Sequence, residues 1–237
     1  MKKEKKPILL EGDLGKTAFN IYYRKAQYEY GDNPLLKGLQ IDNSSGIVRN
    51  ANTYALALLN EVLSTTELSS YRLVRQGEVE ELIRGSEMPF VMNIQTGILV
   101  TSNQRSESEH HLRGALEEGI RGHFSYVQLP PVVIPMPEVF LGIDKESPTG
   151  MTLKHSPGEG FVIAPQLDMH YDGYTFKEFD SRGLPLLDMH GKRILHTCPK
   201  AYTGLYKVHV ENAHSLYAND HRLEHAERDN VVLVVKR

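Results

Sequence analysis

Leu129-Pro-Pro-Val-Val-Ile-Pro-Met-Pro137 divides this sequence into two parts with different patterns. Four prolines in nine residues exclude a helix and a central strand, because proline lacks the amide hydrogen that both structures use. The stretch is therefore predicted to be an extended connector. It separates a mixed α/β portion at residues 1–128 from a β portion at residues 138–237. The two portions fit either one fused domain or two close-packed subdomains.

Helical periodicity is found only before the connector. Residues 54–63 place apolar side chains three and four positions apart, and Asn52 or Thr53 can cap this helix. Ser106-Glu-Ser-Glu109 is a capping box, and an apolar helical stripe follows it. Residues 78–83 are a third, shorter candidate. The N-terminal portion is therefore predicted to hold two or three helices.

Strand patterns complete the prediction of the fold. Residues 90–94 and 98–101 flank Gln95-Thr96-Gly97 and are predicted to form a hairpin. After the connector, short strand candidates alternate with turn signals, which is typical of an antiparallel sandwich or barrel. The predicted fold class is α+β, with N-terminal helices and a small sheet followed by this antiparallel β portion.

A cluster of tyrosines near the N-terminus allows two interpretations. Tyr22-Tyr23-Arg24-Lys25 is followed by Tyr28 and Tyr30. Aromatic side chains mixed with cations can stack bases and hold phosphates. Tyrosine also fills half-buried strand faces and interfaces, and this second interpretation is favoured.

Composition excludes several classes of protein. The chain has 237 residues, of which 40% are hydrophobic and 24% charged, as in folded soluble proteins. The formal net charge of −3 does not indicate a nucleic-acid-binding or membrane-surface protein. Cys198 is the single cysteine, which excludes an internal disulfide and a multi-thiolate metal site. No run of about 18 apolar residues predicts a membrane helix. We therefore expect a soluble, cytoplasmic protein.

The one chemical signal lies among the histidines. Eight of the 11 histidines lie at or after His155. Asp168, His170 and Asp172 alternate, so in a strand they would share one face. An imidazole and a carboxylate two positions apart are two ligands of a 2-His-1-carboxylate metal site, which leaves open positions on iron. The third ligand must come from elsewhere in the chain.

His170-Tyr-Asp172 resembles the His-x-Asp motif of iron(II)/2-oxoglutarate-dependent oxygenases. His221-Arg-Leu-Glu-His225 and Arg228 resemble the closing segment of that family, although the spacing is shorter than usual. The resemblance implies that His170, Asp172 and His221 bind iron(II) and that Arg228 anchors 2-oxoglutarate. It also implies a double-stranded β-helix fold. His214 and His225 are alternatives to His221 as the distal ligand.

A local hairpin would constrain this site. A two-residue loop at Ser181-Arg182 sets His170 opposite Arg193 and His190 opposite Gly173, on the other face. A shift of one residue places both histidines on one face, where both could bind one metal. The sequence does not choose between the two registers.

Two classes of function remain. The first is a metal-dependent enzyme centred on His170 and Asp172. The second is a non-enzymatic structural or RNA-binding subunit of a larger assembly, such as a viral, phage or ribonucleoprotein component. The absence of a strong catalytic motif favours the second class. Homo-oligomerisation or assembly partners are expected for it, and no membrane partner is expected for either class.

Overall fold

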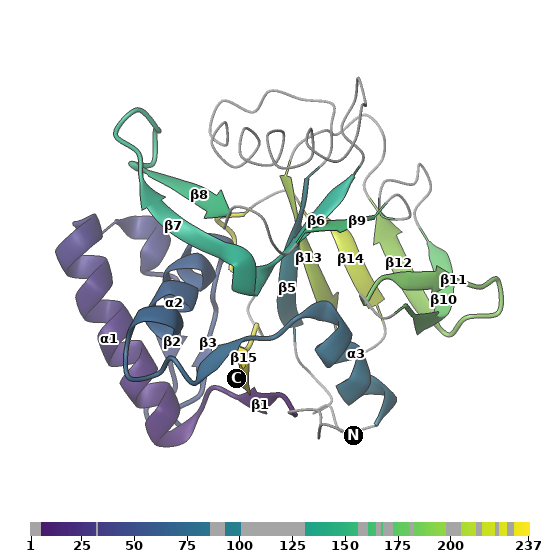
Figure 1. The fold of residues 1–237 in the computed structure, drawn as a ribbon, viewed down its shortest axis with the longest axis horizontal. Coiled ribbons are helices and arrows are strands. Elements are labelled where there is room, and N and C mark those ends of the chain that lie inside the picture. Colours follow the sequence, from purple (N-terminus) through teal and green to yellow (C-terminus); the bar gives the residue numbers. More distant parts are fainter. Residues whose placement is uncertain are drawn as a thin grey trace.

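The computed structural model describes residues 6–31, 33–85, 93–100, 131–155, 161–164, 167, 173–180, 183–197, 205–211, 215–220, 223–226 and 230–237. Within them, helices and three small sheets lie beside one larger, curled sheet (Figure 1). The helices are α1 (Gly12–Tyr30), α2 (Thr53–Thr65) and α3 (Gln76–Arg84), with 3₁₀ turns η1 (Pro34–Leu36) and η3 (Met136–Glu138). The strands are β1 (Ile8–Leu9), β2 (Gln40–Ile41), β3 (Val48–Arg49), β4 (Tyr71–Leu73), β5 (Asn93–Val100), β6 (Val132–Pro135), β7 (Val139–Ile143), β8 (Met151–His155), β9 (Val162–Ile163), β10 (Tyr174–Phe179), β11 (Pro185–Leu187), β12 (Arg193–Thr197), β13 (Leu205–Glu211), β14 (Ser215–Asp220) and β15 (Leu233–Lys236). None of the helices described is long and apolar enough to cross a membrane.

The larger sheet has eight strands in the order β11-β10-β12-β14-β13-β5-β6-β9. Together with the N-terminal helices it confirms the predicted α+β class. One pair, β12 and β14, is parallel, whereas the sequence predicted a purely antiparallel β portion. The reason is that β14 inserts between β12 and β13 and is antiparallel to β13. The chain therefore reverses twice between β12 and β14, which run in the same direction.

Strand β5 runs without interruption through the residues predicted to form a hairpin turn, so that prediction is wrong. Its neighbours are β13 and β6, and the β13 register shifts between Gly97 and Gln95, which leaves Thr96 as a bulge. Gly97 is needed for close approach rather than for a turn. A Cβ at this position would lie 2.8 Å from the carbonyl oxygen of Ile134 on β6.

The proline-rich stretch was predicted to be a connector without a central strand, and this prediction is wrong for its second half. Strand β6 pairs with β5 on one side and with β9 on the other. Strand β9 pairs only with Val132 and Val133, so Pro135 lies beyond that ladder. Pro135 is tolerated because it is the last residue of this short strand, and Pro131 stands directly before the strand.

Helix α1 was not predicted, and the tyrosines assigned to a strand or an interface belong to it. Its buried side is a stripe of small residues around one large ring: Gly15, Ala18, Tyr22 and Ala26. The Tyr22 hydroxyl donates a hydrogen bond of 2.7 Å to the carbonyl oxygen of Leu36. Tyr28, by contrast, is almost fully exposed. One face of this tyrosine cluster therefore has a packing role within the fold.

Helices α2 and α3 confirm the sequence predictions. Asn52 caps α2, because its side-chain oxygen accepts a hydrogen bond of 2.8 Å from the Ala55 amide. Helix α2 is buried on nearly all sides, and even its Asn60 lies inside, donating to the carbonyl oxygens of Pro137 and Val139. Helix α3 is amphipathic and buries Val79. The helix predicted after Ser106 lies outside the described residues.

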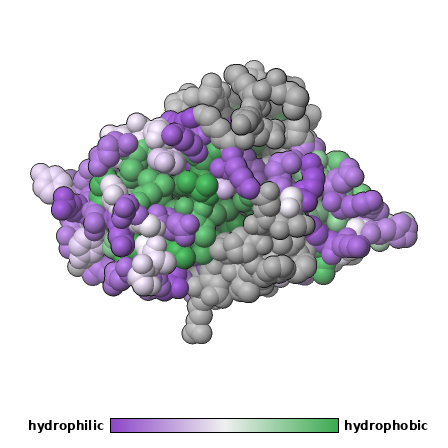
Figure 2. Space-filling model, turned by 90° about the horizontal axis from the view of Figure 1, so that it is seen from below, coloured by the Kyte–Doolittle hydropathy of each residue, from purple (hydrophilic) through white to green (hydrophobic). Residues whose placement is uncertain are grey.

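Two cores fill the interior. The first core joins α1 and α2 to β7 and β8, and the second core lies between α3 and the eight-stranded sheet. Seen from below, the part of the molecule that holds α1 and α2 shows apolar side chains within a frame of hydrophilic ones (Figure 2). The opposite end, with the β10–β11 hairpin, is mostly hydrophilic. The polar groups discussed below border the second core.

The packing of α3 against the β10–β11 hairpin can be tested by a substitution at Gly183. This residue has a positive φ of 82°, and a Cβ there would overlap the Gly77 backbone, reaching its Cα at 2.9 Å. We expect Gly183→Ala to lower the free energy of unfolding by about 3 kcal/mol in urea denaturation.

Gly150→Ala is the matched control, because Gly150 has a similar φ of 72° but no described atom within 4 Å of its Cβ position. It should lose only about 1 kcal/mol, the contribution of backbone strain alone. Equal losses in the two variants would contradict the contact between Gly183 and α3.

Candidate functional site

The four predicted site residues, His170, Asp172, His221 and Arg228, lie outside the described residues. His214 and Cys198 lie outside them as well. Among the residues that are described, no group of three or more His, Cys, Asp or Glu side chains could hold a metal ion. The predicted metal site therefore stays a prediction, and the described strands show only which parts of the fold lead into it.

His190 does not lie opposite Gly173. Next to the loop, β10 and β11 pair one residue off the register of a two-residue loop, with Phe179 opposite Pro185. A register shift then brings Phe176 opposite Leu187. The pairing ends there, because the chain turns at Asp188: the Gly191 amide donates to the Asp188 carbonyl oxygen. The exposed His190 lies in this turn, and β10 has β12 on its other side. Neither register considered for His190 is observed.

The strands next to the predicted ligands meet at one end of the large sheet. Strand β10 is antiparallel to β12, and β12 is parallel to β14. The start of β10 is therefore at the end of the sheet toward which β12 and β14 run. Tyr174, its first residue, lies opposite Leu195 and at the level of Leu216, and β14 continues four residues further to Asp220. Asp172 directly precedes Gly173, whose amide donates to the Leu195 carbonyl oxygen, and His221 directly follows the last residue of β14.

A row of stacked rings, His196, Tyr217 and His209, crosses three neighbouring strands near this end. The His196 and Tyr217 ring centroids are 4.3 Å apart, those of Tyr217 and His209 are 5.0 Å apart, and the rings are nearly parallel. Each pair is directly opposite in the strand register. Lys207, buried two residues before His209 on the same strand face, donates a hydrogen bond to the His225 carbonyl oxygen. Imidazole, phenol and amine groups thus gather on one face of the sheet.

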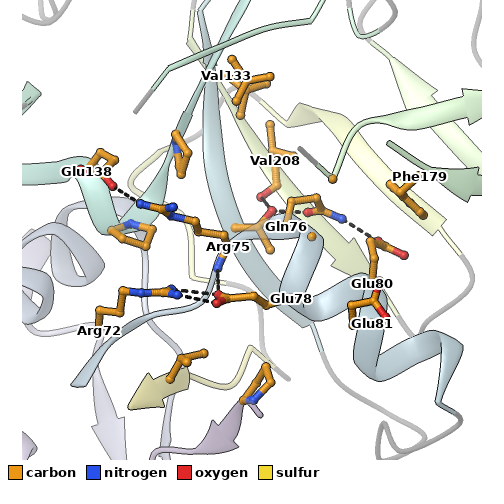
Figure 3. Close-up of a pocket in the computed structure, with 18 of the residues that line it drawn as sticks. Arg72, Arg75, Gln76, Glu78, Glu80, Glu81, Val133, Glu138, Phe179 and Val208 are labelled. Atoms are coloured by element: carbon orange, nitrogen blue, oxygen red, sulfur yellow. Dashed lines mark hydrogen bonds and ion pairs between the residues drawn. The ribbon is translucent and has the colours of Figure 1, made fainter. Parts of the chain in front are cut away.

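A groove of about 1570 Å³ runs around α3 and is named here the α3 groove. Strands β4, β6 and β15 contribute to its lining, together with the β10–β11 turn and both sides of α3. The close-up shows on one side of α3 the arginines and glutamates that pair with one another: Arg72, Arg75, Glu78 and Glu138 (Figure 3). Gln76, Glu80 and Phe179 lie on the other side. The groove is larger than most sites for small molecules, which measure roughly 300–1,000 Å³.

A chain of buried polar contacts lies in the α3 groove. The Thr96 hydroxyl donates to the Gln76 side-chain oxygen, and the Gln76 amide donates to Glu80 at 2.6 Å. Glu80, only 3% exposed, also accepts two hydrogen bonds from the guanidinium of Arg193. That guanidinium lies 4.8 Å from the ring centroid of Phe176. The Glu80–Arg193 ion pair connects α3 to β12, although the two residues lie 113 positions apart.

Burial raises the pKa of Glu80 to about 6, and the hydrogen bonds and charge of Arg193 oppose this rise. A carboxyl group with a raised pKa in a cleft is a candidate functional group. Here its hydrogen-bond partners belong to the protein itself. The network therefore has a structural role, and the remaining room in the groove is what a ligand could use.

The charged side of the groove is mostly internally neutralised. Arg72 forms a two-bond ion pair with Glu78, and Arg75 pairs with Glu138 at 2.6 Å. Glu78 also accepts a hydrogen bond of 2.8 Å from the Arg75 amide, which caps α3. Lys236 has no ion-pair partner within the described parts of the chain. Arg237 has none there either, and its guanidinium donates to the Ser64 hydroxyl at 3.4 Å. An excess of positive charge therefore remains where β15 ends.

Comparison with known proteins adds no constraint. No family model matches this sequence, no curated protein matches it, and no solved structure matches it.

The contribution of the buried pair can be measured by removing one partner. Glu80→Ala leaves the Arg193 charge buried and unpaired, so we expect the free energy of unfolding to fall by about 3–5 kcal/mol. Glu81→Ala is the matched control, since Glu81 pairs with Arg84 at the surface and should lose less than about 1 kcal/mol. A loss in Glu80→Ala as small as in Glu81→Ala would show that the pair does not hold α3.

The raised pKa of Glu80 predicts a pH dependence. Between its ordinary value of 4.5 and about 6, the folded protein binds more protons at this site than the unfolded chain does. Proton binding by Glu80 therefore adds about 2 kcal/mol to the free energy of unfolding at pH values below this window. That contribution is lost as the pH rises through the window. Urea denaturation at several pH values should show the wild type losing this amount relative to Glu80→Gln. A difference that is constant with pH would contradict the raised pKa.

Proposed function

We propose that this chain is a metal-dependent enzyme whose metal is held by His170, Asp172 and His221. The observation that supports this proposal is the convergence of strand ends. The residues that lead into His170 and Asp172 and the residue that precedes His221 lie at the same end of the eight-stranded sheet. Only β12 stands between them, so β10 and β14 are about 10 Å apart. Ligands that adjoin these two strand ends in the sequence can share one metal ion.

The ring row adds chemistry at this end of the sheet. His196 is one residue from the last residue of β12, and Tyr217 lies opposite it on β14. An imidazole and a phenol are groups that enzymes use for proton transfer. In this proposal they act beside the metal.

The resemblance to iron(II)/2-oxoglutarate-dependent oxygenases makes iron(II) the proposed metal, and 2-oxoglutarate, anchored by Arg228, the proposed cosubstrate. Iron held by two imidazoles and a carboxylate keeps open positions for substrate and oxygen. Eight of the described strands form one sheet with a parallel pair, which differs from the two facing antiparallel sheets of a double-stranded β-helix. The cosubstrate therefore needs a test separate from that of the metal.

An anaerobic thermal-shift titration with Mn(II) in place of Fe(II) tests the metal site. Saturating Mn(II) should raise Tm of the metal-free protein by about 5–10 °C. His170→Ala and His221→Ala should abolish the shift. If 2-oxoglutarate binds, it should add to the shift in the wild type and fail to do so in Arg228→Ala.

His190→Ala is the matched control. His190 ends Leu187-Asp-Met-His190, which repeats the sequence Leu167-Asp-Met-His170, but it lies exposed in a turn. This variant should respond to Mn(II) as the wild type does. The metal proposal is wrong if Mn(II) and Zn(II) leave Tm unchanged, or if His170→Ala and wild type respond alike. A Mn(II) shift without an effect of 2-oxoglutarate would retain the metal enzyme and remove the oxygenase assignment.

A further inference from the structure

We propose that the α3 groove binds an extended peptide segment of a partner protein, acidic at one end and apolar at the other. This site is independent of the proposed metal centre. The alternative class of function is a subunit of a larger assembly, and the α3 groove would be the surface that contacts its partner.

The shape of the groove favours an extended chain. Its volume of about 1570 Å³ exceeds that of most small-molecule sites. Two edge strands contribute to its lining, β9 of the eight-stranded sheet through Val162 and β4 of the three-stranded sheet through Arg72. Within the described residues each of these strands pairs on one side only. An edge strand offers main-chain groups to which a peptide can add as a further strand.

The charge of the groove defines one end of the ligand. Lys236 and Arg237 are exposed at the end of β15, beside Arg72 on β4. Arg72 is neutralised by Glu78, so the uncompensated charge comes from Lys236 and Arg237. Acidic side chains of a peptide would complement it.

The opposite end of the groove is apolar. Its lining there comes from the β9 side and from the sheet: Val133, Val162, Leu167, Phe179 and Leu216. Its polar groups are already bonded to one another through Gln76 and Glu80. An apolar segment could therefore contact this part without leaving a buried polar group unpaired.

A peptide fits this groove better than a nucleic acid does. Glu78, Glu80, Glu81, Glu138 and Asp180 all line the groove. The formal net charge of the whole chain is −3. The groove's arginines Arg72, Arg75 and Arg84 are paired with Glu78, Glu138 and Glu81. A polyanion would therefore find uncompensated cations at one end only, which a peptide with acidic residues at one end complements.

Panning of a random peptide library displayed on phage, with the full chain as bait, tests the proposal. We expect the enriched peptides to share acidic residues at one end and apolar residues at the other. Fluorescence anisotropy should then show that Lys236→Glu with Arg237→Glu weakens binding of an enriched peptide by at least about tenfold. Val162→Glu, at the apolar end, should weaken it as well.

Lys177→Glu with Lys192→Glu is the matched control, because these two exposed lysines lie outside the groove and their reversal changes the net charge equally. It should leave the peptide affinity within about twofold of the wild type. The proposal is wrong if no peptide is enriched, if the enriched peptides lack acidic residues, or if both double variants bind alike. It is also wrong if a uridine oligonucleotide displaces the enriched peptide. The Mn(II) response of the groove variants should equal that of the wild type, which separates this site from the metal centre.

Discussion

The structure depends on the pairing of β5 with β13, and on the bulge at Thr96 within it. The bulge inserts one residue, so the second core receives an even-numbered position before the bulge and an odd-numbered position after it. Ile94 and Leu99 belong to the second core, whereas Ile98 and Val100 belong to the first. One strand therefore packs on α2 through one face and on α3 through the other.

The polar side chains beside the bulge make the same connection. Gln95 donates a hydrogen bond of 2.8 Å to Thr53 at the start of α2, while Thr96 donates to Gln76 at the start of α3. Each helix is thus positioned by a buried hydrogen bond to neighbouring residues of one strand. Buried polar groups must find partners, so these bonds restrict the helices more than apolar contact alone would. The Glu80–Arg193 pair then fixes the remaining freedom of α3.

The sequence predicted what local patterns control. Helix α2 was found because its apolar periodicity and the Asn52 cap both lie within a few residues. Helix α1 was missed because its buried stripe is made of glycine and alanine around Tyr22, and small residues give a weak hydrophobic signal. Gly97 was taken for a turn, although its role comes from the approach of β6, which no local pattern contains. The partner of Glu80 lies 113 positions away, so the i, i+4 spacing of Gln76 and Glu80 was the only sequence signal for the groove network.

The α3 groove and the ring row lie on opposite faces of the same strands. Val208 and Leu216 line the α3 groove, while the residues that follow them, His209 and Tyr217, belong to the ring row. Side chains alternate between the faces of a strand, so a one-residue register shift in β13 or β14 would exchange apolar and polar side chains between the two sites. The apolar second core prevents that exchange, because it would have to bury His209 and Tyr217 in place of Val208 and Leu216. Packing of α3 against the sheet therefore also determines which groups the other face presents near the proposed metal centre.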